Sequence, residues 1–268
     1  MKENVTLSII LMAVPSPIRL ATINVASIRS ARARFMAFDF LSRVEADILF
    51  LQETWLASVA EMHLAKREWR CGPSLWSLAA EPCSGVAVLF KTGSVACRRV
   101  IEVEIGRCLV VDAVVRGQFL RLINFYGPQT KRERKSLLTA VKPYLFTSQQ
   151  VIFGGDFNMI TRPKDRAGAA NPLGYDSTFL NSVVREAGLV DVHVRHLPNL
   201  TGFTFSRGSS KSRLDRFFFK GGLCLLGSRA AVGGVLRSLY GICGPECRRH
   251  SSEREGYVAP EWVATGGS

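Results

Sequence analysis

The segment V-I-F-G-G-D-F-N, from Val151 to Asn158, carries the strongest architectural signal in this sequence. Val151 to Phe153 form an apolar run with β-branched residues, a pattern typical of a buried strand. Gly154 and Gly155 then leave backbone that another chain segment or a ligand can approach closely. Asp156 and Asn158 follow, and alternation along extended chain sends both side chains to the same side. The sequence therefore predicts a carboxylate and an amide at the end of a buried strand, where open α/β sheets place their chemistry.

Polar side chains also end three other predicted strands. Asn24 lies near the exit of an alternating strand, Glu53 follows a continuous apolar strand, and Tyr126 ends the second arm of a hairpin. A lone D-x-N is more often an Asx turn that caps a strand. Four such strand ends in one chain favour a shared site instead.

The hydrophobic periodicity predicts alternating strands and helices. The predicted strands are Ile18–Val25, Asp47–Leu51, Gly85–Phe90, Leu109–Val115, Phe119–Phe125, Thr201–Ser206 and Leu214–Lys220. The predicted helices are Ser30–Val44, Ser58–Trp69, Thr130–Leu145 and a segment capped by Asp176 or Ser177 and ended by Gly188.

Two of these helices carry more specific signals. Phe35, Phe38, Leu41 and Val44 recur at helical spacing, which predicts a stripe that faces the core. Thr130 precedes Glu133 by three residues, the spacing of a capping box.

Composition limits the class of protein and its partners. The chain has 268 residues, of which 47% are hydrophobic and 21% charged, as expected for one large globular α/β domain. Its formal net charge of +13 favours a polyanionic partner, with nucleic acid first and an acidic membrane second. Seven cysteines without paired spacing indicate reduced thiols, and hence a nuclear or cytoplasmic protein. We expect a monomer without a membrane anchor.

Three regions follow from these patterns. Residues 1–17 form a leader whose apolar run, Val5 to Val14, is too short to span a bilayer. Glu3 and the missing A-x-A cleavage pattern argue against a signal peptide. Residues 18–220 form the domain. Residues 221–268 are rich in Gly, Ser, Arg and Cys without sustained periodicity, which predicts a poorly ordered tail.

The donors at the strand ends indicate a hard cation. A carboxylate with an adjacent amide, as at Asp156 and Asn158, with no cluster of histidines or cysteines, suits Mg²⁺ or Mn²⁺. A zinc site of Cys224, Cys243, Cys247 and His250 is a weaker alternative, because the C-x₃-C-x₂-H spacing lacks a defined fourth ligand.

The order of these segments resembles the endonuclease/exonuclease/phosphatase superfamily, and within it the endonuclease domain of LINE-type (non-LTR) retrotransposons. The matching segments are I-R-L-A-T-I-N-V, D-I-L-F-L-Q-E-T, G-V-A-V-L-F, I-N-F-Y-G-P, G-G-D-F-N, G-F-T-F and S-R-L-D-R-F, between Ile18 and Phe219. The resemblance implies a four-layer α/β/β/α sandwich, like that of deoxyribonuclease I. It also implies Mg²⁺-dependent cleavage of a DNA phosphodiester.

The same resemblance implies a role for each site residue. Glu53 would be the principal metal ligand, with Asn24 beside it. Asp156 would handle the proton of the attacking water or of the leaving group, and Asn158 would orient that water and the phosphate. Tyr126 would hydrogen-bond a phosphate oxygen. Thr204 and Arg213 would contact DNA. Asp215 would orient a catalytic histidine.

The sequence departs from the family pattern after Asp215. The family carries a Ser-Asp-His block on its last sheet strand, and no such tripeptide occurs here. We therefore expect the fold to lack its last strand, the tail to form at most a short helix around Gly234 to Tyr240, and Asp215 to lack its histidine.

Three functions remain open at this stage. The first is a metal-dependent DNA endonuclease of retrotransposon origin. The second is a degenerate, non-enzymatic relic that binds nucleic acid, which the missing Ser-Asp-His block favours. The third is a phosphatase that acts on an inositol or lipid phosphate.

Overall fold

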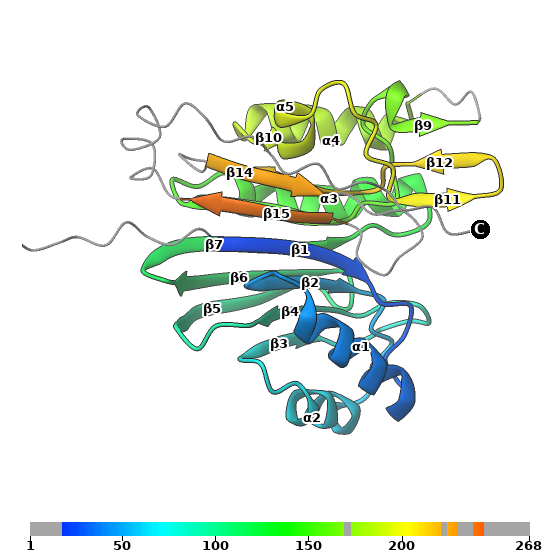
Figure 1. Cartoon of the computed structure of the whole chain (residues 1–268). Coiled ribbons are helices and arrows are strands. Elements are labelled where there is room, and N and C mark those ends of the chain that lie inside the picture. Colours follow the sequence, from blue (N-terminus) through cyan, green and yellow to red (C-terminus); the bar gives the residue numbers. More distant parts are fainter. Residues whose placement is uncertain (1–17, 169–172, 221–223, 230–237, 244–268) are drawn as a thin grey trace, which may run out of the picture.

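The computed structural model describes residues 18–168, 173–220, 224–229 and 238–243, and their arrangement is shown in Figure 1. The strands are β1 (Ile18–Asn24), β2 (Ile48–Gln52), β3 (Ser74–Ser77), β4 (Val86–Phe90), β5 (Val95–Glu104), β6 (Cys108–Val115), β7 (Gln118–Tyr126), β8 (Gln150–Asp156), β9 (Arg166–Ala167), β10 (Val190–Asp191), β11 (Phe205–Arg207), β12 (Ser210–Ser212), β13 (Asp215–Phe219), β14 (Cys224–Arg229) and β15 (Ser238–Cys243). The helices are α1 (Ala31–Arg43), α2 (Val59–Glu68), α3 (Lys131–Leu145), α4 (Tyr175–Glu186) and α5 (Val192–His196), with a 3-10 turn at Pro163–Asp165.

Two six-stranded sheets form the centre of the molecule. The first has the order β14-β15-β1-β2-β4-β3, and the second has the order β10-β13-β8-β7-β6-β5. Within each sheet one pair of strands is parallel, β1 with β2 and β7 with β8, and a helix connects the two strands of each pair. Parallel neighbours end at the same edge of their sheet, so the residues that follow these four strands are brought together.

Three separate apolar clusters confirm the four-layer α/β/β/α sandwich. Between the sheets, Phe50 of the first packs near Phe217 of the second, with ring centroids 5.4 Å apart. The outer face of the first sheet packs on α1 and α2, and the outer face of the second packs on α3 and α4. In β13, Phe217 and Phe219 face the inter-sheet core while Phe218 faces the helices, because successive side chains alternate.

A buried polar network joins the two sheets. Gln52 donates from Nε2 to Oδ1 of Asn124 over 2.8 Å. Asn124 in turn donates to the backbone oxygens of Leu51, at 3.0 Å, and Ala87, at 2.8 Å. Both amide side chains are fully buried, so each of these hydrogen bonds is needed to offset lost hydration. The network lies one residue before Glu53 and two before Tyr126, and it fixes the sheets relative to each other at that end.

The expectation that the fold lacks its last strand is wrong. The strand β15 pairs antiparallel with β1, from Ile18 opposite Ile242 to Thr22 opposite Ser238, and β14 pairs with β15. Without this neighbour the central strand β1 would have a row of unpaired backbone groups along one edge. The helix expected around Gly234 to Tyr240 is also wrong at its C-terminal end, because Ser238 onward is strand. The predicted leader, residues 1–17, lies outside the described residues.

Other local expectations hold with specific exceptions. Ser30 caps α1 by accepting from the amide of Ala33, and Thr130 caps α3 by accepting from the amide of Glu133. The predicted cap of α4 is wrong, because the N-cap residue is Gly174, and Asp176 and Ser177 lie inside the first turn.

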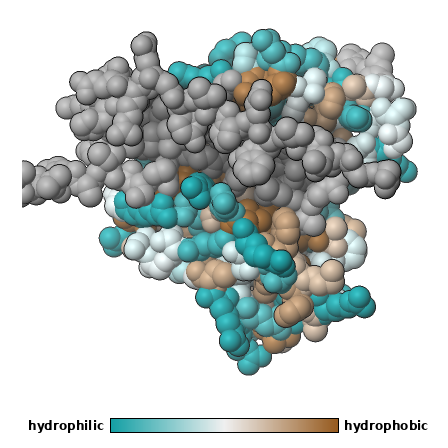
Figure 2. Space-filling model, viewed as in Figure 1, coloured by the Kyte–Doolittle hydropathy of each residue, from teal (hydrophilic) through white to brown (hydrophobic). Residues whose placement is uncertain are grey.

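The predicted stripe of α1 is correct for Phe38, Leu41 and Val44, which are buried. Phe35 is 71% exposed, so its assignment to the core is wrong, and Met36 beside it is 59% exposed. Figure 2 shows hydrophobic residues at the surface in the lower half of the molecule, the part that α1 and α2 occupy in Figure 1. Within the part of the chain that the structure describes, no helix is long and apolar enough to cross a bilayer.

Candidate active site

Glu53 is the residue on which the site converges. Its Oε1 accepts from Nδ2 of Asn24 at 2.6 Å and from the hydroxyl of Tyr126 at 2.8 Å. Asn24 comes from the first sheet and Tyr126 from the second, so the carboxylate bridges the open ends of both sheets. The predicted convergence of Asn24, Glu53 and Tyr126 is present in the structure.

The backbone of Glu53 is in the left-handed region, with φ of 57°. A residue with a Cβ adopts this conformation at a cost of roughly 1–2 kcal/mol. The carbonyl oxygen of Glu53 accepts from the amide of Ser27 at 2.8 Å, which fixes the peptide that follows. Strained backbone that persists beside convergent polar groups is typical of a functional site.

Asn24 contacts both carboxylates of the site through its amide nitrogen. Besides Glu53, Nδ2 lies 3.4 Å from Oδ2 of Asp156, while Oδ1 accepts from the backbone amide of Ala26 at 3.1 Å. In this arrangement Asn24 holds the two carboxylates side by side. Its assignment as a metal ligand, which would use the oxygen, stays a prediction.

Asp156 and Asn158 are held by a turn against the loop after β7. Asp156 is 3% exposed, and its Oδ1 accepts from the amide of Asn158 at 3.0 Å. The Nδ2 of Asn158 donates to the carbonyl of Gly127 at 2.6 Å, and the amide of Gly127 donates to the carbonyl of Asp156 at 2.8 Å. The Asx turn that the sequence allowed is therefore real, and it coexists with the shared site.

The hydroxyl of Tyr126 remains a proton donor at neutral pH. Burial, the charge of Glu53 and the hydrogen bond to Glu53 together raise the pKa of Tyr126 well above its ordinary value. Tyr126 is 1% exposed, so water does little to relieve this effect. A neutral tyrosine can donate to an anionic oxygen, as the predicted role requires.

Arg107 belongs to the site and was missed by the sequence analysis. Its guanidinium carbon lies 4.7 Å from the ring centroid of Tyr126, and its carbonyl accepts from the amide of Tyr126. Arg107 is 6% exposed and pairs with Glu81, yet its Nη1 is buried and has no hydrogen-bond partner among the described residues. The only sequence signal was its place after the turn glycine Gly106 and before an apolar strand.

Asp215 lies beside Asp156, because the two residues are directly opposite each other in the β13–β8 ladder. The amide of Asp215 donates to Oγ1 of Thr204 at 3.1 Å. Among the histidines with described side chains, His63 is exposed on α2 and His193 hydrogen-bonds Leu200. The orienting role of Asp215 toward a histidine stays a prediction.

Thr204 and Arg213 are placed at the base of this site and not on its surface. Thr204 is 4% exposed, and Arg213 is 1% exposed. Arg213 pairs with both Asp165 and Asp191, so all of its donor nitrogens are used inside the protein. The surface that meets a substrate has to come from other residues.

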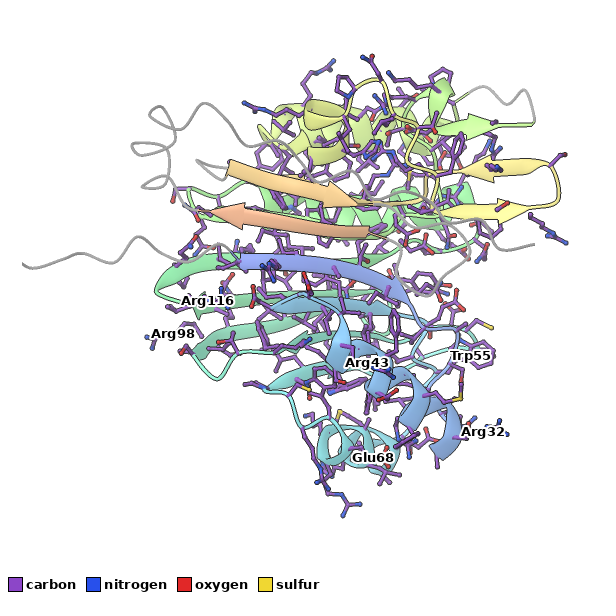
Figure 3. All side chains as sticks on the ribbon, viewed as in Figure 1. Arg32, Arg43, Trp55, Glu68, Arg98 and Arg116 are labelled. Atoms are coloured by element: carbon purple, nitrogen blue, oxygen red, sulfur yellow. The ribbon has the colours of Figure 1, made fainter. Side chains whose placement is uncertain are left out.

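Exposed cations lie on the segments that flank the site. The strand β9 follows the turn after Asn158, and the hairpin β11–β12 precedes β13. This small sheet carries the exposed Arg207 and Lys211 and the half-buried Arg166, and it projects from the sandwich at the end to which β1 points in Figure 1. In Figure 3, Arg32 and Trp55 lie at that same end, whereas Arg98 and Arg116 lie at the opposite end.

The donors present fit Mg²⁺ or Mn²⁺. No group of three or more His, Cys, Asp or Glu side chains with metal-binding geometry occurs among the described residues. Mg²⁺ keeps several water ligands and is commonly held by one or two carboxylates together with substrate phosphate. Glu53 is half-buried and reaches solvent, so it is the accessible carboxylate of the pair it forms with Asp156. The side chains of the alternative zinc residues are not among those described.

Comparisons with known proteins agree with this architecture. Archaeoglobus fulgidus has an AP endonuclease of known structure that matches 84% of this chain and 99% of its own, at 19% identity and a TM-score of 0.67. The AP endonuclease LMAP from Leishmania major matches 85% of this chain and 88% of its own, at 18% identity and a TM-score of 0.66. At these identities the two structures establish the fold alone.

The sequence comparisons establish the family. A Xenopus laevis protein, the transposon TX1 uncharacterized 149 kDa protein, is 26% identical over 206 residues, which are 74% of this chain. The chain spans only 16% of that relative. The family model for the endonuclease/exonuclease/phosphatase family matches residues 21–234, a range that extends past Lys220. The chain belongs to the endonuclease/exonuclease/phosphatase family.

Proposed function

We propose that this chain is a DNA endonuclease domain that depends on Mg²⁺ or Mn²⁺ and cleaves phosphodiester bonds. The observation that carries the proposal is the convergence of Glu53, Asn24, Tyr126 and Asp156 within hydrogen-bonding distance, from the ends of both sheets. Bound at Glu53, the cation would stabilise negative charge on a phosphate oxygen.

Four side chains of the site stabilise the phosphate charge and activate the attacking water. With substrate bound, Tyr126 turns its single hydroxyl proton from Glu53 to a phosphate oxygen as the charge on that oxygen grows, and Arg107 adds positive charge behind the tyrosine ring. Asp156 takes the proton of the attacking water. Asn158 orients that water with its side-chain oxygen Oδ1, because its Nδ2 donates to the carbonyl of Gly127.

A basic surface supports DNA as the substrate. The net charge is +13, and exposed Arg207 and Lys211 project on the hairpin next to the site. If these cations neutralise phosphates, the logarithm of the affinity should fall linearly with the logarithm of salt, by about 0.9 per phosphate contacted.

Binding of DNA without cleavage is the second candidate. The strand β15 begins with Ser238-Leu239-Tyr240, and its first residue is opposite Thr22, two residues before Asn24. The family resemblance implies Ser-Asp-His on this strand, so an acid and a histidine are absent from the sequence there. Loss of a positioned general acid or base lowers rates by about 10²–10⁴-fold.

Nicking of supercoiled plasmid with Mg²⁺ or Mn²⁺, measured together with duplex binding, separates the two candidates. The endonuclease requires metal-dependent nicking that Asp156→Ala abolishes while DNA binding persists. If the chain binds DNA in a salt-sensitive way, and nicking is at background both in the native chain and in Asp156→Ala, the endonuclease proposal is wrong and DNA binding without cleavage takes its place. Glu53→Gln should remove Mn²⁺ binding in calorimetry, and unchanged affinity would overturn the metal assignment.

A further inference from the structure

Two buried arginines, Arg34 and Arg134, occupy matching places in the two halves of the sandwich. Each lies four residues after the N-cap of the helix that follows a strand of the site, and its amide donates to that N-cap carbonyl. Arg34 is 2% exposed and Arg134 is 7% exposed. Neither is available to a substrate at the surface.

The two guanidinium groups share a bonding pattern, in which Nη1 donates to two loop carbonyls and Nε donates to a carboxylate on the neighbouring helix. From Nη1, Arg34 donates to the carbonyls of Ile28 and Arg29, at 3.3 and 2.9 Å. Its Nε and Nη2 bind both carboxylate oxygens of Glu68, which is labelled on α2 in Figure 3.

Arg134 repeats this pattern in the second half. Its Nη1 donates to the carbonyls of Pro128 and Gln129, at 2.9 and 2.7 Å, and its Nε binds Asp176 of α4 at 2.7 Å. In both cases the arginine ties a strand-to-helix loop to a carboxylate on the neighbouring helix.

The loops held in this way carry the backbone of the site. In the first, the amides of Ser27 and Ile28 donate to the carbonyls of Glu53 and Thr54, at 2.8 and 3.1 Å. The left-handed backbone of Glu53 is thereby pinned from one side. In the second, Gly127 bonds to the carbonyl of Asp156 and accepts from the side chain of Asn158.

We propose that Arg34 and Arg134 are a duplicated pair of positioning residues, Arg34 for Glu53 and Arg134 for Asn158. The proposal rests on the proposed function for the roles of Glu53 and Asn158. Arg34 acts on the metal ligand, because it fixes the loop that holds the strained peptide after Glu53. Arg134 acts on orientation of water and phosphate, because it fixes the carbonyls of Pro128 and Gln129, next to the Gly127 carbonyl that accepts from the Asn158 amide.

Lysine substitutions test the pair. Arg34→Lys and Arg134→Lys keep the charge but lack the fork that reaches two carbonyls and a carboxylate together. Arg43→Lys is the matched control, since Arg43 is exposed at the end of α1 and, within the described part of the chain, pairs with Asp39 alone. Amide hydrogen exchange, Mn²⁺ titration and plasmid nicking are measured on the whole chain.

Each substitution should change amide hydrogen exchange only in the loop that its own arginine holds. Arg34→Lys should speed exchange of the Ser27 and Ile28 amides by about tenfold and leave Gly127 and Asn158 unchanged. Arg134→Lys should do the reverse, and Arg43→Lys should change neither loop. Equal acceleration of both loops in both variants would mean that the arginines act only through global stability, and would overturn the proposal.

The functional readouts should separate in the same way. Arg34→Lys should weaken Mn²⁺ affinity about tenfold, whereas Arg134→Lys should keep that affinity and lower the nicking rate constant at saturating metal. Weaker Mn²⁺ binding in Arg134→Lys alone would reverse the assignment and refute it. If the native chain neither binds Mn²⁺ nor nicks DNA, the proposed function fails, and the exchange pattern still decides the structural pairing.

Discussion

The two halves of the sandwich are each a six-stranded sheet with its covering helices and loops, and each contains one strand–helix–strand unit, β1–α1–β2 in the first and β7–α3–β8 in the second. The two units are built alike but supply different side chains to the site. Both have parallel strands, a Ser or Thr N-cap and a buried arginine that ties the loop to the next helix. The first half supplies one carboxylate, Glu53, which is strained and reaches solvent. The second half supplies two buried acids, Asp156 and Asp215, side by side in the β8–β13 ladder.

The two halves show how one fold can place a solvent-accessible carboxylate, Glu53, next to buried carboxylates, Asp156 and Asp215. A carboxylate open to solvent can share a hydrated cation, because Mg²⁺ releases its waters reluctantly. Buried carboxylates have their proton affinity set by their neighbours instead. The second half also carries buried ion pairs behind the site, in which Arg213 and Arg216 bind Asp165 and Asp191. In the first half, the buried Arg34 pairs with the partly exposed Glu68, and Arg19 and Glu45 pair at the surface.

Removing one buried arginine should produce the largest change in stability. Arg216 is fully buried, contacts Asp165 and donates to the carbonyl of Met159 at 2.9 Å. Arg216→Met should lower the free energy of unfolding by about 3–5 kcal/mol, because a buried carboxylate loses a partner. Arg19→Met in the first half should change it by less than about 1 kcal/mol. Urea denaturation of both variants measures these changes. Equal losses of unfolding free energy would mean that the ion pairs of the two halves contribute equally to stability.

Separating the two sheets at their polar junction should have the next largest effect. Asn124→Leu removes the partner of Gln52 and the donor to the carbonyls of Leu51 and Ala87. The expected loss is about 1–3 kcal/mol, the usual penalty for a buried polar group left unsatisfied. Thermal unfolding measures it. A neutral effect would show that the sheets are held in register by apolar packing alone.

The loss of stability in acid should come mainly from carboxylates of the second half, above all Asp165. Burial alone would raise the pKa of Asp165, but the charges of Arg216 and Arg213 outweigh it and hold that pKa well below the ordinary range. A carboxylate with a depressed folded-state pKa stabilises the fold fully above its unfolded value of about 3.9, and this contribution is lost as pH falls through the folded value.

Glu61 and Glu68 of the first half also have lowered pKa values, caused mainly by Arg29 and Arg34, but both are near the surface and contribute little. Urea denaturation should therefore give a lower free energy of unfolding at pH 3 than at pH 7. This difference between the two pH values should be smaller in Asp165→Asn. The same pH dependence in Glu68→Gln and in Asp165→Asn would contradict the assignment to the second half.

The smallest predicted effect compares two residues of the site whose backbone is in the left-handed region. Glu53 and Asn158 have φ of 57° and 51°. Glu53→Gly should change the free energy of unfolding by less than about 1 kcal/mol, because the relief of strain offsets the loss of the hydrogen bonds from Asn24 and Tyr126, while Mn²⁺ binding is lost. Asn158→Gly should lower it by about 1 kcal/mol, because asparagine tolerates this conformation and its bond to Gly127 disappears. Chemical denaturation measures both values, and a larger loss in Glu53→Gly than in Asn158→Gly would show that strain at Glu53 is not relieved.

The sequence by itself determined which residues end the strands of the site. Asn24, Glu53, Tyr126, Asp156 and Asn158 were all found from local patterns, because strand alternation and breaks at glycine depend only on neighbouring residues. The cap at Thr130 followed from the same short-range rules. The family resemblance supplied the four layers.

Only the tertiary structure decided which distant segments meet. The pairing of β15 with β1 joins residues more than two hundred positions apart, and its glycine-interrupted sequence gave no periodicity from which to predict it. An arginine in a sequence fits a DNA contact or a buried ion pair equally well, and Arg213, Arg34 and Arg107 are distinguished only by the partners that the fold brings to them. Charge is a property of the residue, but its role depends on burial and on the groups that surround it.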